Sequence, residues 1–222
     1  MSIEFDYPLV AEITRNVDAA LTEDIGPGDL TASLVPAART ARATVISREA
    51  GVLCGCAWFD RCVTHLDPAA EVVWRAADGD LIATNQVLCE IRANARALLS
   101  AERSALNFLQ TLSATATQTA AYVAAVAGTR TRVLDTRKTL PGLRVAQKYA
   151  VRVGGGQNQR LALWHGILIK ENHIAAAGSV PEVMRQALAL NAGVTIQIEV
   201  ETLDQLQQAL AAGATSVLLD NF

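Results

Sequence analysis

Short apolar runs that end in polar residues recur along the second half of the chain. The runs are Arg132–Leu134, Ile167–Ile169, Ile196–Ile198 and Val217–Leu219. The polar residues that follow them are Asp135–Lys138, Lys170–His173, Glu199 and Asp220–Asn221. In a parallel β/α barrel the active site is built from residues at the carboxyl ends of the strands. Polar residues that recur at this place therefore predict one shared site.

Helical patterns stand between these runs. They cover Pro141–Val153, Pro181–Leu190 and Thr202–Ala211. Ser179 stands where a helix cap is expected, and Gly193 and Gly213 stand where helix ends favour a residue that tolerates positive φ. The alternation of strand and helix predicts parallel βα units.

The number of predicted strands raises a difficulty. A closed barrel of this kind normally has about eight strands, and the pattern supplies four. An open parallel sheet leaves edge groups and apolar surface uncovered. We therefore expect an incomplete barrel in the given sequence, which is either a fragment or is covered by another subunit.

The first half of the chain has a different pattern. Leu9–Asp24 shows helical spacing, and Ala41–Cys89 contains short β-branched runs between Gly and Asp turns, which predicts a small antiparallel sheet. Ala97–Ala127 lacks Gly and Pro and predicts a long helix with a break near Ser113. The predicted fold class is α/β, with an N-terminal α+β sandwich domain over residues 1–114 and a partial parallel β/α-barrel domain over residues 115–222.

Composition and charge indicate which kinds of binding partner to expect. The 222 residues include 19 Lys and Arg and 22 Asp and Glu, and no cluster of basic residues indicates a nucleic-acid partner. No apolar run reaches the roughly 18 residues that span a bilayer, and Met1–Val10 lacks the basic start of a signal peptide. We expect a folded cytoplasmic protein with no nucleic-acid or membrane partner.

The four cysteines are Cys54, Cys56, Cys62 and Cys89. None forms a CxxC pair, and the spacing fits no usual zinc pattern. Cys54 and Cys56 would point the same way from a strand. We interpret all four as buried free thiols rather than as metal ligands or redox residues.

Cations at the predicted strand ends are the first candidates for chemistry. They are Arg137, Lys138, Arg160 and Lys170, and Arg160 follows a run of three glycines that allows close approach to a ligand. Arginine matches carboxylate or phosphate with a planar fork, and lysine offers a point charge. Their convergence would make a pocket for a ligand with several negative groups. The alternative is that they are ordinary surface cations.

Carboxylates at two further strand ends extend this hypothesis. Glu199 and Asp220 would face the same mouth of the barrel. Carboxylates there can bind Mg²⁺ together with phosphate and water, or accept hydrogen bonds from sugar hydroxyls. A phosphorylated sugar with a metal is one interpretation, and structural salt bridges to Lys170 or Arg137 are the other.

Longer motifs run through nearly the whole chain. They are EDIGPGDLT from Glu23, ERSALN from Glu102, LQTLS from Leu109, LDTRKTLPGLR from Leu134, KYAVR from Lys148, GGG from Gly154, LIKENHI from Leu168, IEVE from Ile198 and LLDNF from Leu218. In these motifs and their order the chain resembles the quinolinate phosphoribosyltransferase family, whose members are also called carboxylating nicotinate-nucleotide pyrophosphorylases.

The resemblance implies an activity. Members of this family transfer a phosphoribosyl group from phosphoribosyl pyrophosphate to quinolinate in the presence of Mg²⁺. The products are nicotinate mononucleotide, pyrophosphate and CO₂, in NAD biosynthesis. The resemblance also implies a homodimer or higher homo-oligomer with shared active sites.

The resemblance assigns roles to matching residues. Arg137, Lys138 and Arg160 match residues that hold the two quinolinate carboxylates, and Gln159 occupies a further substrate-binding position beside them. Arg103 matches a residue that reaches the active site of the neighbouring subunit.

The remaining matches concern the phosphorylated substrate. The position of Lys170 contacts that substrate, and those of Glu199 and Asp220 serve the ribose and the metal. We therefore expect Lys138, Lys170, Glu199 and Asp220 to be the catalytic residues.

The chain also departs from the family pattern. The family reads NHR where this chain has Asn158-Gln159-Arg160, so a neutral amide replaces an imidazole that can carry charge. Trp164-His165-Gly166 stands where the family has an acidic residue, and the family continues for several tens of residues past LDNF.

These departures keep two alternatives open. One is a catalytically impaired or truncated member that binds anions or dimerises without turnover. The other is a related pyrophosphorylase for a different base, such as the relative found with molybdate transport genes. The intact LIKENH and DTRKT motifs favour quinolinate.

Overall fold

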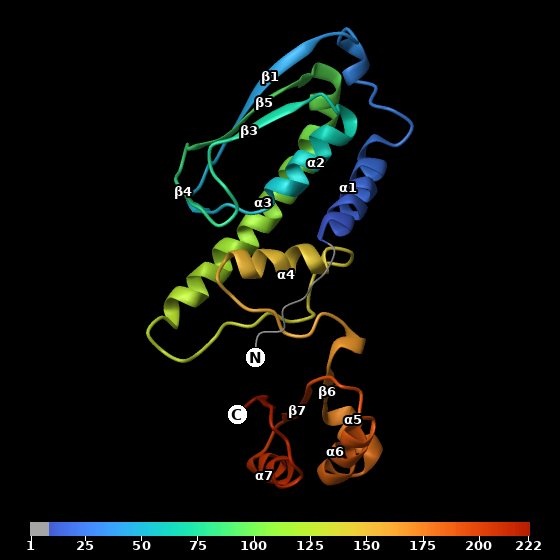
Figure 1. The fold of residues 1–222 in the computed structure, drawn as a ribbon, viewed down its shortest axis with the longest axis vertical. Helices are drawn as coiled ribbons and strands as arrows, with labels where there is room; N and C mark the ends of the chain where they lie inside the picture. The colour runs from blue at the N-terminus through green and yellow to red at the C-terminus, as the bar shows by residue number, and fades with distance from the viewer. Residues whose placement is uncertain (1–8) are drawn as a thin grey trace. The chain divides into compact units, whose positions relative to one another are not determined.

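The computed structural model describes residues 9–222. The chain forms two compact units, Met1–Gln159 and Arg160–Phe222. Helices and strands are mixed in both units (Figure 1), as the predicted α/β class requires. The domain boundary predicted after residue 114 stays a prediction.

An antiparallel sheet forms one layer of the first unit. Strand β5 (Val87–Asn94) lies between β1 (Thr40–Ile46) and β3 (Glu71–Trp74), and Ile91 pairs with both neighbours. The short strands β2 (Gly51–Val52) and β4 (Leu81–Ile82) form a separate antiparallel pair. The predicted small antiparallel sheet is confirmed.

Helices form the second layer of this unit. They are α1 (Leu9–Ile25), the 3₁₀ turn η1 (Ala32–Leu34), α2 (Cys56–Leu66), α3 (Ala95–Ala125) and α4 (Arg144–Val153). The predicted helices at the positions of α1, α3 and α4 are confirmed. The predicted break near Ser113 is wrong, because α3 runs through it. Ser113 Oγ accepts a hydrogen bond from the Cys54 amide at 2.9 Å and donates one to the Cys54 carbonyl at 3.1 Å, so its hydroxyl bonds a neighbouring segment.

Helix α2 was not predicted. The interpretation of Cys54 and Cys56 as parts of one strand is wrong, since Cys56 begins this helix. Gly55 precedes it with a φ of 108°, and Asp78 Oδ1 accepts from the amides of Gly55 at 3.0 Å and Cys56 at 3.1 Å. A carboxylate distant in sequence thus caps the helix.

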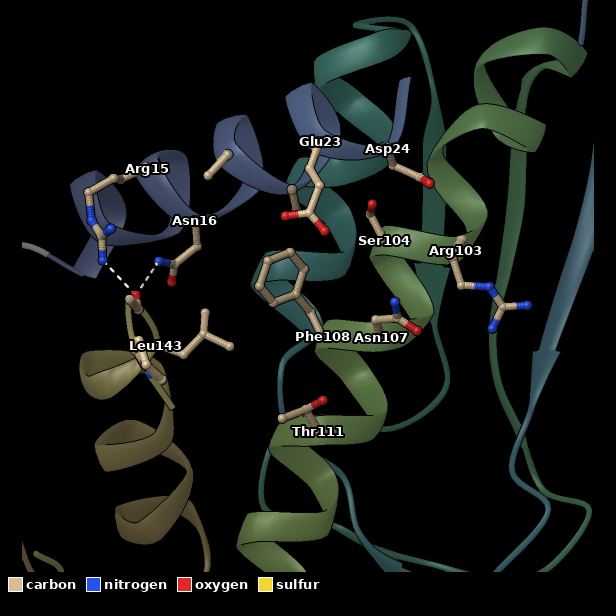
Figure 2. Close-up of a pocket in the computed structure, with 14 residues that line it drawn as sticks. Arg15, Asn16, Glu23, Asp24, Arg103, Ser104, Asn107, Phe108, Thr111 and Leu143 are labelled. Atoms are coloured by element: carbon tan, nitrogen blue, oxygen red, sulfur yellow. Dashed lines mark hydrogen bonds between the residues drawn. The ribbon is translucent and has the colours of Figure 1, made fainter. Parts of the chain in front are cut away.

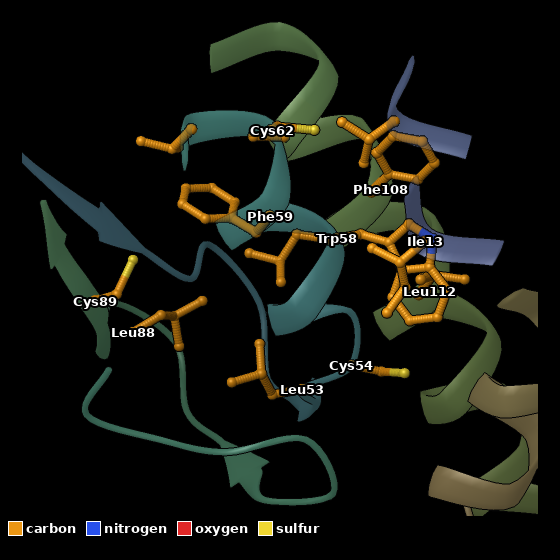
Figure 3. Close-up of a cluster of buried hydrophobic side chains, with 14 of the residues drawn as sticks. Ile13, Leu53, Cys54, Trp58, Phe59, Cys62, Leu88, Cys89, Phe108 and Leu112 are labelled. Carbon is orange, nitrogen blue, oxygen red and sulfur yellow. The ribbon is translucent and has the colours of Figure 1, made fainter. Parts of the chain in front are cut away.

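The core of the first unit lies between the sheet and the helices (Figure 3). Trp58, Leu53 and Leu112 are among its fully buried side chains. The Trp58 indole keeps a partner for its polar atom, because Nε1 donates to Asn16 Oδ1 at 3.1 Å.

The four cysteines are free, as expected. Cys54, Cys62 and Cys89 are buried and Cys56 is half-buried. Burial raises the pKa of the Cys62 and Cys89 thiols to about 12. These thiols therefore stay protonated and unreactive near neutral pH.

A parallel sheet organises the second unit. Its strands are β6 (Ile167–Ile169), β7 (Ile196–Val200) and β8 (Val217–Leu219), in that order across the sheet. The prediction of a strand at Arg132–Leu134 is wrong. Leu134 makes one isolated bridge to Gln157 and belongs to the first unit.

Helices of the second unit are α5 (Glu171–Ala177), α6 (Val180–Ala189) and α7 (Leu203–Ala211), with the 3₁₀ turn η2 at Leu163–His165. The predicted helices at α6 and α7 are confirmed, and α5 was not predicted. Ser179 caps α6 by accepting from the Glu182 amide at 3.3 Å, and Gly193 and Gly213 have positive φ, as expected.

The two faces of the parallel sheet differ. Ile198 and Val200 on one face are fully buried against α6 and α7 residues such as Met184 and Ala209. Strand residues alternate between faces, so Gln197 and Glu199 lie on the other face. Among residues 9–222, no helix is both long and apolar enough to span a membrane.

Candidate active site

Lys170, Glu199 and Asp220 meet at the carboxyl ends of the three parallel strands. The register pairs Ile169 with Ile198 and Glu199 with Leu218, so Lys170 after β6 comes level with Glu199, and Asp220 after β8 lies two positions beyond Leu218. Lys170 Nζ lies 3.3 Å from Glu199 Oε1, and their side chains are 44% and 11% exposed. This ion pair faces solvent on the lysine side, where a ligand can reach it.

Asp220 joins this pair through the backbone. Its amide donates to the Val200 carbonyl at 3.0 Å, which continues the ladder beyond β8. Because side chains alternate along a strand, Asp220 lies on the same face as Leu218 and hence as Glu199. The predicted pairing of a cation and a carboxylate is thus seen for Lys170 and Glu199, and Asp220 lies at the same edge of the sheet. That the three side chains form one site stays a prediction.

His173 fixes the backbone at Lys170. The Lys170 amide donates to His173 Nδ1 at 3.0 Å, and the Lys170 carbonyl accepts from the His173 amide at 2.8 Å. These two bonds close the turn from β6 into α5. They explain why the LIKENH motif holds a lysine at this strand end in a defined direction.

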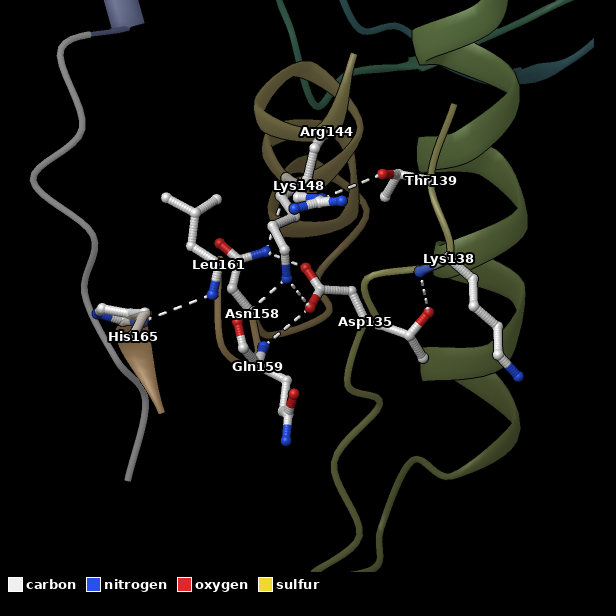
Figure 4. A network of polar contacts seen from close by, with 10 residues as sticks. Asp135, Lys138, Thr139, Arg144, Lys148, Asn158, Gln159, Leu161 and His165 are labelled. Atoms are coloured by element: carbon white, nitrogen blue, oxygen red, sulfur yellow. Dashed lines mark hydrogen bonds and ion pairs between the residues drawn. The ribbon is translucent and has the colours of Figure 1, made fainter. Parts of the chain in front are cut away.

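A second polar cluster lies in the first unit (Figure 4). Asp135 is its centre and accepts hydrogen bonds from Lys148 Nζ, from Asn158 Nδ2 at 2.6 Å and from the Gln159 amide at 2.8 Å. The Asp135 and Lys148 side chains are only 6% and 3% exposed. Burial lowers the pKa of Lys148, and its bond to the Asp135 carboxylate opposes that shift.

Arg137 and Lys138 follow Asp135 directly. Lys138 is exposed, and its amide donates to Thr136 Oγ1 at 3.0 Å. Arg137 Nε is buried and has no hydrogen-bond partner within residues 9–222. In the same part of the chain, Arg61 Nε is the other buried side-chain nitrogen or oxygen without a partner. A buried donor without a partner is costly, which makes this atom a candidate for a ligand contact.

Arg160 begins the second unit. Its Nη1 donates to the Gly166 carbonyl at 3.0 Å. Gly166 lies close to this side chain, since a Cβ there would be 3.4 Å from Arg160 Cβ. The guanidinium is thus held by the turn that leads into β6.

The glycines Gly154–Gly156 have a packing role. A Cβ on Gly154 would lie 2.4 Å from the Ala116 carbonyl oxygen, and a Cβ on Gly156 would lie 2.8 Å from Thr119 Cγ2. The run therefore allows the chain after α4 to approach α3. This packing gives a reason for the glycines that needs no ligand.

Arg103 lies elsewhere, at a cavity of about 360 Å³ (Figure 2). Arg103, Asn107 and Thr111 line it from successive turns of α3, and Glu23 and Asp24 line it from α1. Glu23, Asp24 and Asn107 were not among the predicted site residues. All three stand in motifs by which the chain resembles the family, EDIGPGDLT for Glu23 and Asp24 and ERSALN for Asn107.

No ready-made metal cage accompanies these clusters. Within residues 9–222, no group of three or more His, Cys, Asp or Glu side chains is arranged to hold a metal ion. The carboxylates of Glu199 and Asp220 suit a different arrangement, because Mg²⁺ in phosphate-transfer sites takes one or two carboxylates and completes its shell with phosphate and water.

Family models and known relatives match this chain. Residues 29–113 match the model described as quinolinate phosphoribosyl transferase, N-terminal domain, and residues 115–222 match the C-terminal domain of the same family. A probable nicotinate-nucleotide pyrophosphorylase [carboxylating] of Bacillus subtilis is 42% identical over 200 residues, covering 90% of this chain and 69% of the relative. The Mycobacterium leprae nicotinate-nucleotide pyrophosphorylase [carboxylating] is 44% identical over 210 residues, covering 91% and 73%.

Solved structures agree with the sequence matches. The nicotinate-nucleotide pyrophosphorylase of Francisella tularensis superposes with a TM-score of 0.91 at 43% identity, covering 96% of this chain and 75% of that one. NadC of Streptococcus pyogenes also gives 0.91, at 41% identity, covering 99% and 78%. With this identity and coverage, the chain belongs to the quinolinate phosphoribosyl transferase family.

Proposed function

We propose that this protein is a carboxylating nicotinate-nucleotide pyrophosphorylase. It transfers a phosphoribosyl group from phosphoribosyl pyrophosphate to quinolinate and forms nicotinate mononucleotide, pyrophosphate and CO₂ in NAD biosynthesis. Family membership supports this function. The observation that carries the site is Arg137, whose buried Nε has no hydrogen-bond partner among residues 9–222, while Lys138 beside it is exposed.

Quinolinate is an aromatic dianion that suits this group of donors. Arg137, Lys138 and Arg160 supply cations that bind its two carboxylates, and Gln159 contributes a neutral amide. Arginine binds a carboxylate through two parallel hydrogen bonds, which fixes the orientation of the ring as well as its position. Orientation matters because the ring nitrogen must face the sugar carbon that it attacks.

The strand-end cluster acts on the other substrate. Lys170 contacts a phosphate or pyrophosphate oxygen, and Glu199 and Asp220 accept hydrogen bonds from the ribose hydroxyls. Mg²⁺ is the cofactor, and Glu199 and Asp220 are the residues that would hold it together with substrate oxygens and water. When bound, it neutralises charge on the departing pyrophosphate.

The reaction is completed in two steps. The ring nitrogen forms a bond to the ribose carbon while the bond from that carbon to pyrophosphate breaks. The carboxylate next to the now cationic nitrogen then leaves as CO₂, and its bonding electron pair stays on the ring carbon, which takes up a proton. Lys138, Lys170, Glu199 and Asp220 are the proposed catalytic residues, because their charges suit the anionic groups, the ribose hydroxyls and the metal of the reaction.

A homo-oligomer with shared active sites is part of the proposal. Arg103 is exposed on α3 at the edge of the cavity between α1 and α3. An exposed arginine in this position can reach a substrate bound to a second copy of the chain. The proposed compartment is the cytoplasm.

Product formation tests the function directly. The chain is incubated with quinolinate, phosphoribosyl pyrophosphate and Mg²⁺, with a full-length family member as control, and nicotinate mononucleotide is quantified. Product above background supports the proposal. In parallel, quinolinate binding to Arg137→Ala is measured by calorimetry, and unchanged binding would refute the assignment of Arg137.

Gln159 favours one second candidate, a family member that binds the substrates without turnover. An amide cannot carry the charge that the family's imidazole can carry at this position. Gln159→His separates the two functions. The enzyme is expected to gain activity from this change, whereas a non-catalytic protein would stay inactive.

A further inference from the structure

Lys148 is a buried cation without an assigned role. It lies on α4, and its side chain is only 3% exposed. A buried ion pair is often no more stabilising than well-packed apolar side chains of the same size. A lysine kept in such a place therefore calls for an explanation other than stability.

The bonds of Lys148 join two segments that carry substrate-binding residues. Its Nζ donates to Asp135, which begins the loop of Arg137 and Lys138. The same Nζ donates to the Gln159 carbonyl at 3.1 Å. Lys148 thus sets the distance between these two segments.

Asp135 and Asn158 complete the junction. The Gln159 amide donates to Asp135 Oδ1 at 2.8 Å, so the backbone of Gln159 is held at its amide and at its carbonyl. Asn158 Nδ2 donates to Asp135 Oδ2 at 2.6 Å and to the Lys148 carbonyl at 2.9 Å. Each polar partner of Lys148 is thereby fixed by a second bond.

The rest of the loop is tied to the same helix and to α1. The Leu140 amide donates to Gln147 Oε1 at 2.8 Å. The Gly142 carbonyl accepts from Arg15 at 2.7 Å and from Asn16 at 3.1 Å (Figure 2). Arg137 is thus held between two anchors on α4. The ion pair with Lys148 fixes Asp135 two residues before it, and Arg144 Nε donates to Thr139 Oγ1 at 3.3 Å two residues after it.

We infer that Lys148 is a positioning residue for quinolinate binding. It touches no substrate, because it is buried, and it acts by fixing the Asp135–Thr139 loop against the Gln157–Gln159 segment. The inference rests on the proposed function, since it assumes that Arg137, Lys138 and Gln159 bind quinolinate. A misplacement of about 1 Å can lower a rate about 100-fold.

The test separates positioning from stability. Lys148→Met combined with Asp135→Asn removes both buried charges and leaves an acceptor for the Gln159 amide. Arg75→Met, which breaks the exposed Arg75–Glu90 pair, is the matched control. Thermal unfolding, the quinolinate Kd from calorimetry, and KM and kcat are measured for each full chain.

We expect the double variant to fold, to bind quinolinate at least tenfold more weakly and to lose about 100-fold in kcat/KM for quinolinate. Its KM for phosphoribosyl pyrophosphate should stay within about twofold of the wild type, because Lys148 holds only the quinolinate side. Lys148→Arg, which keeps the charge, should recover part of the quinolinate affinity and serves as the folded variant if the double variant does not fold.

A folded variant at Lys148 with wild-type quinolinate Kd would overturn the inference and leave Lys148 a structural residue. An equal loss for both substrates would overturn it as well. The failure of the proposed function looks different, because wild-type protein would then neither bind quinolinate nor form product.

Discussion

The two lysine–carboxylate pairs of this protein differ in burial. Lys148 and Asp135 in the first unit are almost completely shielded from solvent, whereas Lys170 in the second unit keeps nearly half of its side chain exposed beside Glu199. Residue types are similar in both pairs. Because it is buried, the Lys148–Asp135 pair fixes the conformation of a loop. The Lys170–Glu199 pair is accessible to a ligand, because Lys170 is partly exposed.

The same contrast appears in the surroundings of each pair. Asp135 receives three hydrogen bonds from protein donors, so it has little capacity left for a substrate. For Glu199 the Lys170 ammonium is the side-chain partner, at 3.3 Å. A satisfied carboxylate serves structure, and a less saturated one can accept bonds from a ligand.

Stability should respond most strongly at the buried pair. Lys148→Met leaves the Asp135 charge buried without its counter-ion, and breaking a buried pair in this way costs about 3–5 kcal/mol. The free energy of unfolding in urea measures the loss. A loss below about 1 kcal/mol would mean that the pair is not desolvated as its burial indicates, and the contrast between the two pairs would fail.

Activity should respond most strongly at the exposed pair. Lys170→Met is expected to lower kcat about 10²–10³-fold, the usual effect of removing one donor to a developing negative charge. Its unfolding free energy should fall by less than that of Lys148→Met, since Lys170 keeps 44% of its side chain exposed and water can partly replace its charge at Glu199. Steady-state kinetics and urea unfolding of the same preparation check both statements. Near-normal kcat, or a large loss of stability, would reverse the assignment.

The positions of the strand-end residues could be predicted because they depend only on neighbouring sequence. Lys170, Glu199 and Asp220 each follow an apolar run, and parallel strands bring their carboxyl ends to one edge. The run at Arg132–Leu134 looks the same in sequence but makes a single bridge to Gln157. Pairing with a partner strand, which the sequence does not display, distinguishes the two.

Other features escaped prediction because distant residues create them. Helix α2 begins at Cys56 under a cap from Asp78, and α3 passes Ser113 because Cys54 satisfies its hydroxyl. The burial of Lys148 depends on Asp135 in the same way, since a lysine on a short helix normally predicts an exposed side chain. The KYAVR motif marked the position without revealing the burial.

Burial also determines the direction of the pKa shift of Asp60 in the first unit. Desolvation raises the pKa of Asp60, and the hydrogen bond from Trp74 Nε1 at 2.8 Å only partly opposes it. Folding therefore favours the protonated form, and this group lowers stability as pH rises from 3.8 through its folded pKa.

Asp60→Asn removes that penalty and keeps an acceptor for Trp74. We expect a small gain in unfolding free energy that is absent well below pH 3.8, grows as pH rises and is constant once Asp60 is fully ionised. Urea unfolding from pH 3 to pH 8 measures it. A gain that is independent of pH would show that packing, and not the charge, causes it.

In the second unit, hydrogen bonds shift the pKa of Glu182, a partly exposed carboxylate, in the opposite direction. Bonds from Arg185 at 2.5 and 2.9 Å, and then from Gln186 at 2.8 Å, lower the pKa of Glu182 to about 2. The folded state thus favours the ionised form, so the contribution to stability is complete above pH 4.5 and is lost as pH falls toward 2. Salt and water screen an exposed pair, so we expect the smallest effect of all here.

Glu182→Gln should lower the unfolding temperature slightly at pH 7, and the difference from the wild type should shrink in high salt and vanish near pH 2. The pKa of Glu182, followed by NMR, is the direct measurement, and Arg185→Gln should return it toward 4.5. A Glu182 pKa near 4.5 in the wild type would mean that the three bonds are transient in solution. Glu182 would then titrate as it does in an unfolded chain. Burial, and not hydrogen bonding at the surface, would then explain why the charged groups of the two units differ.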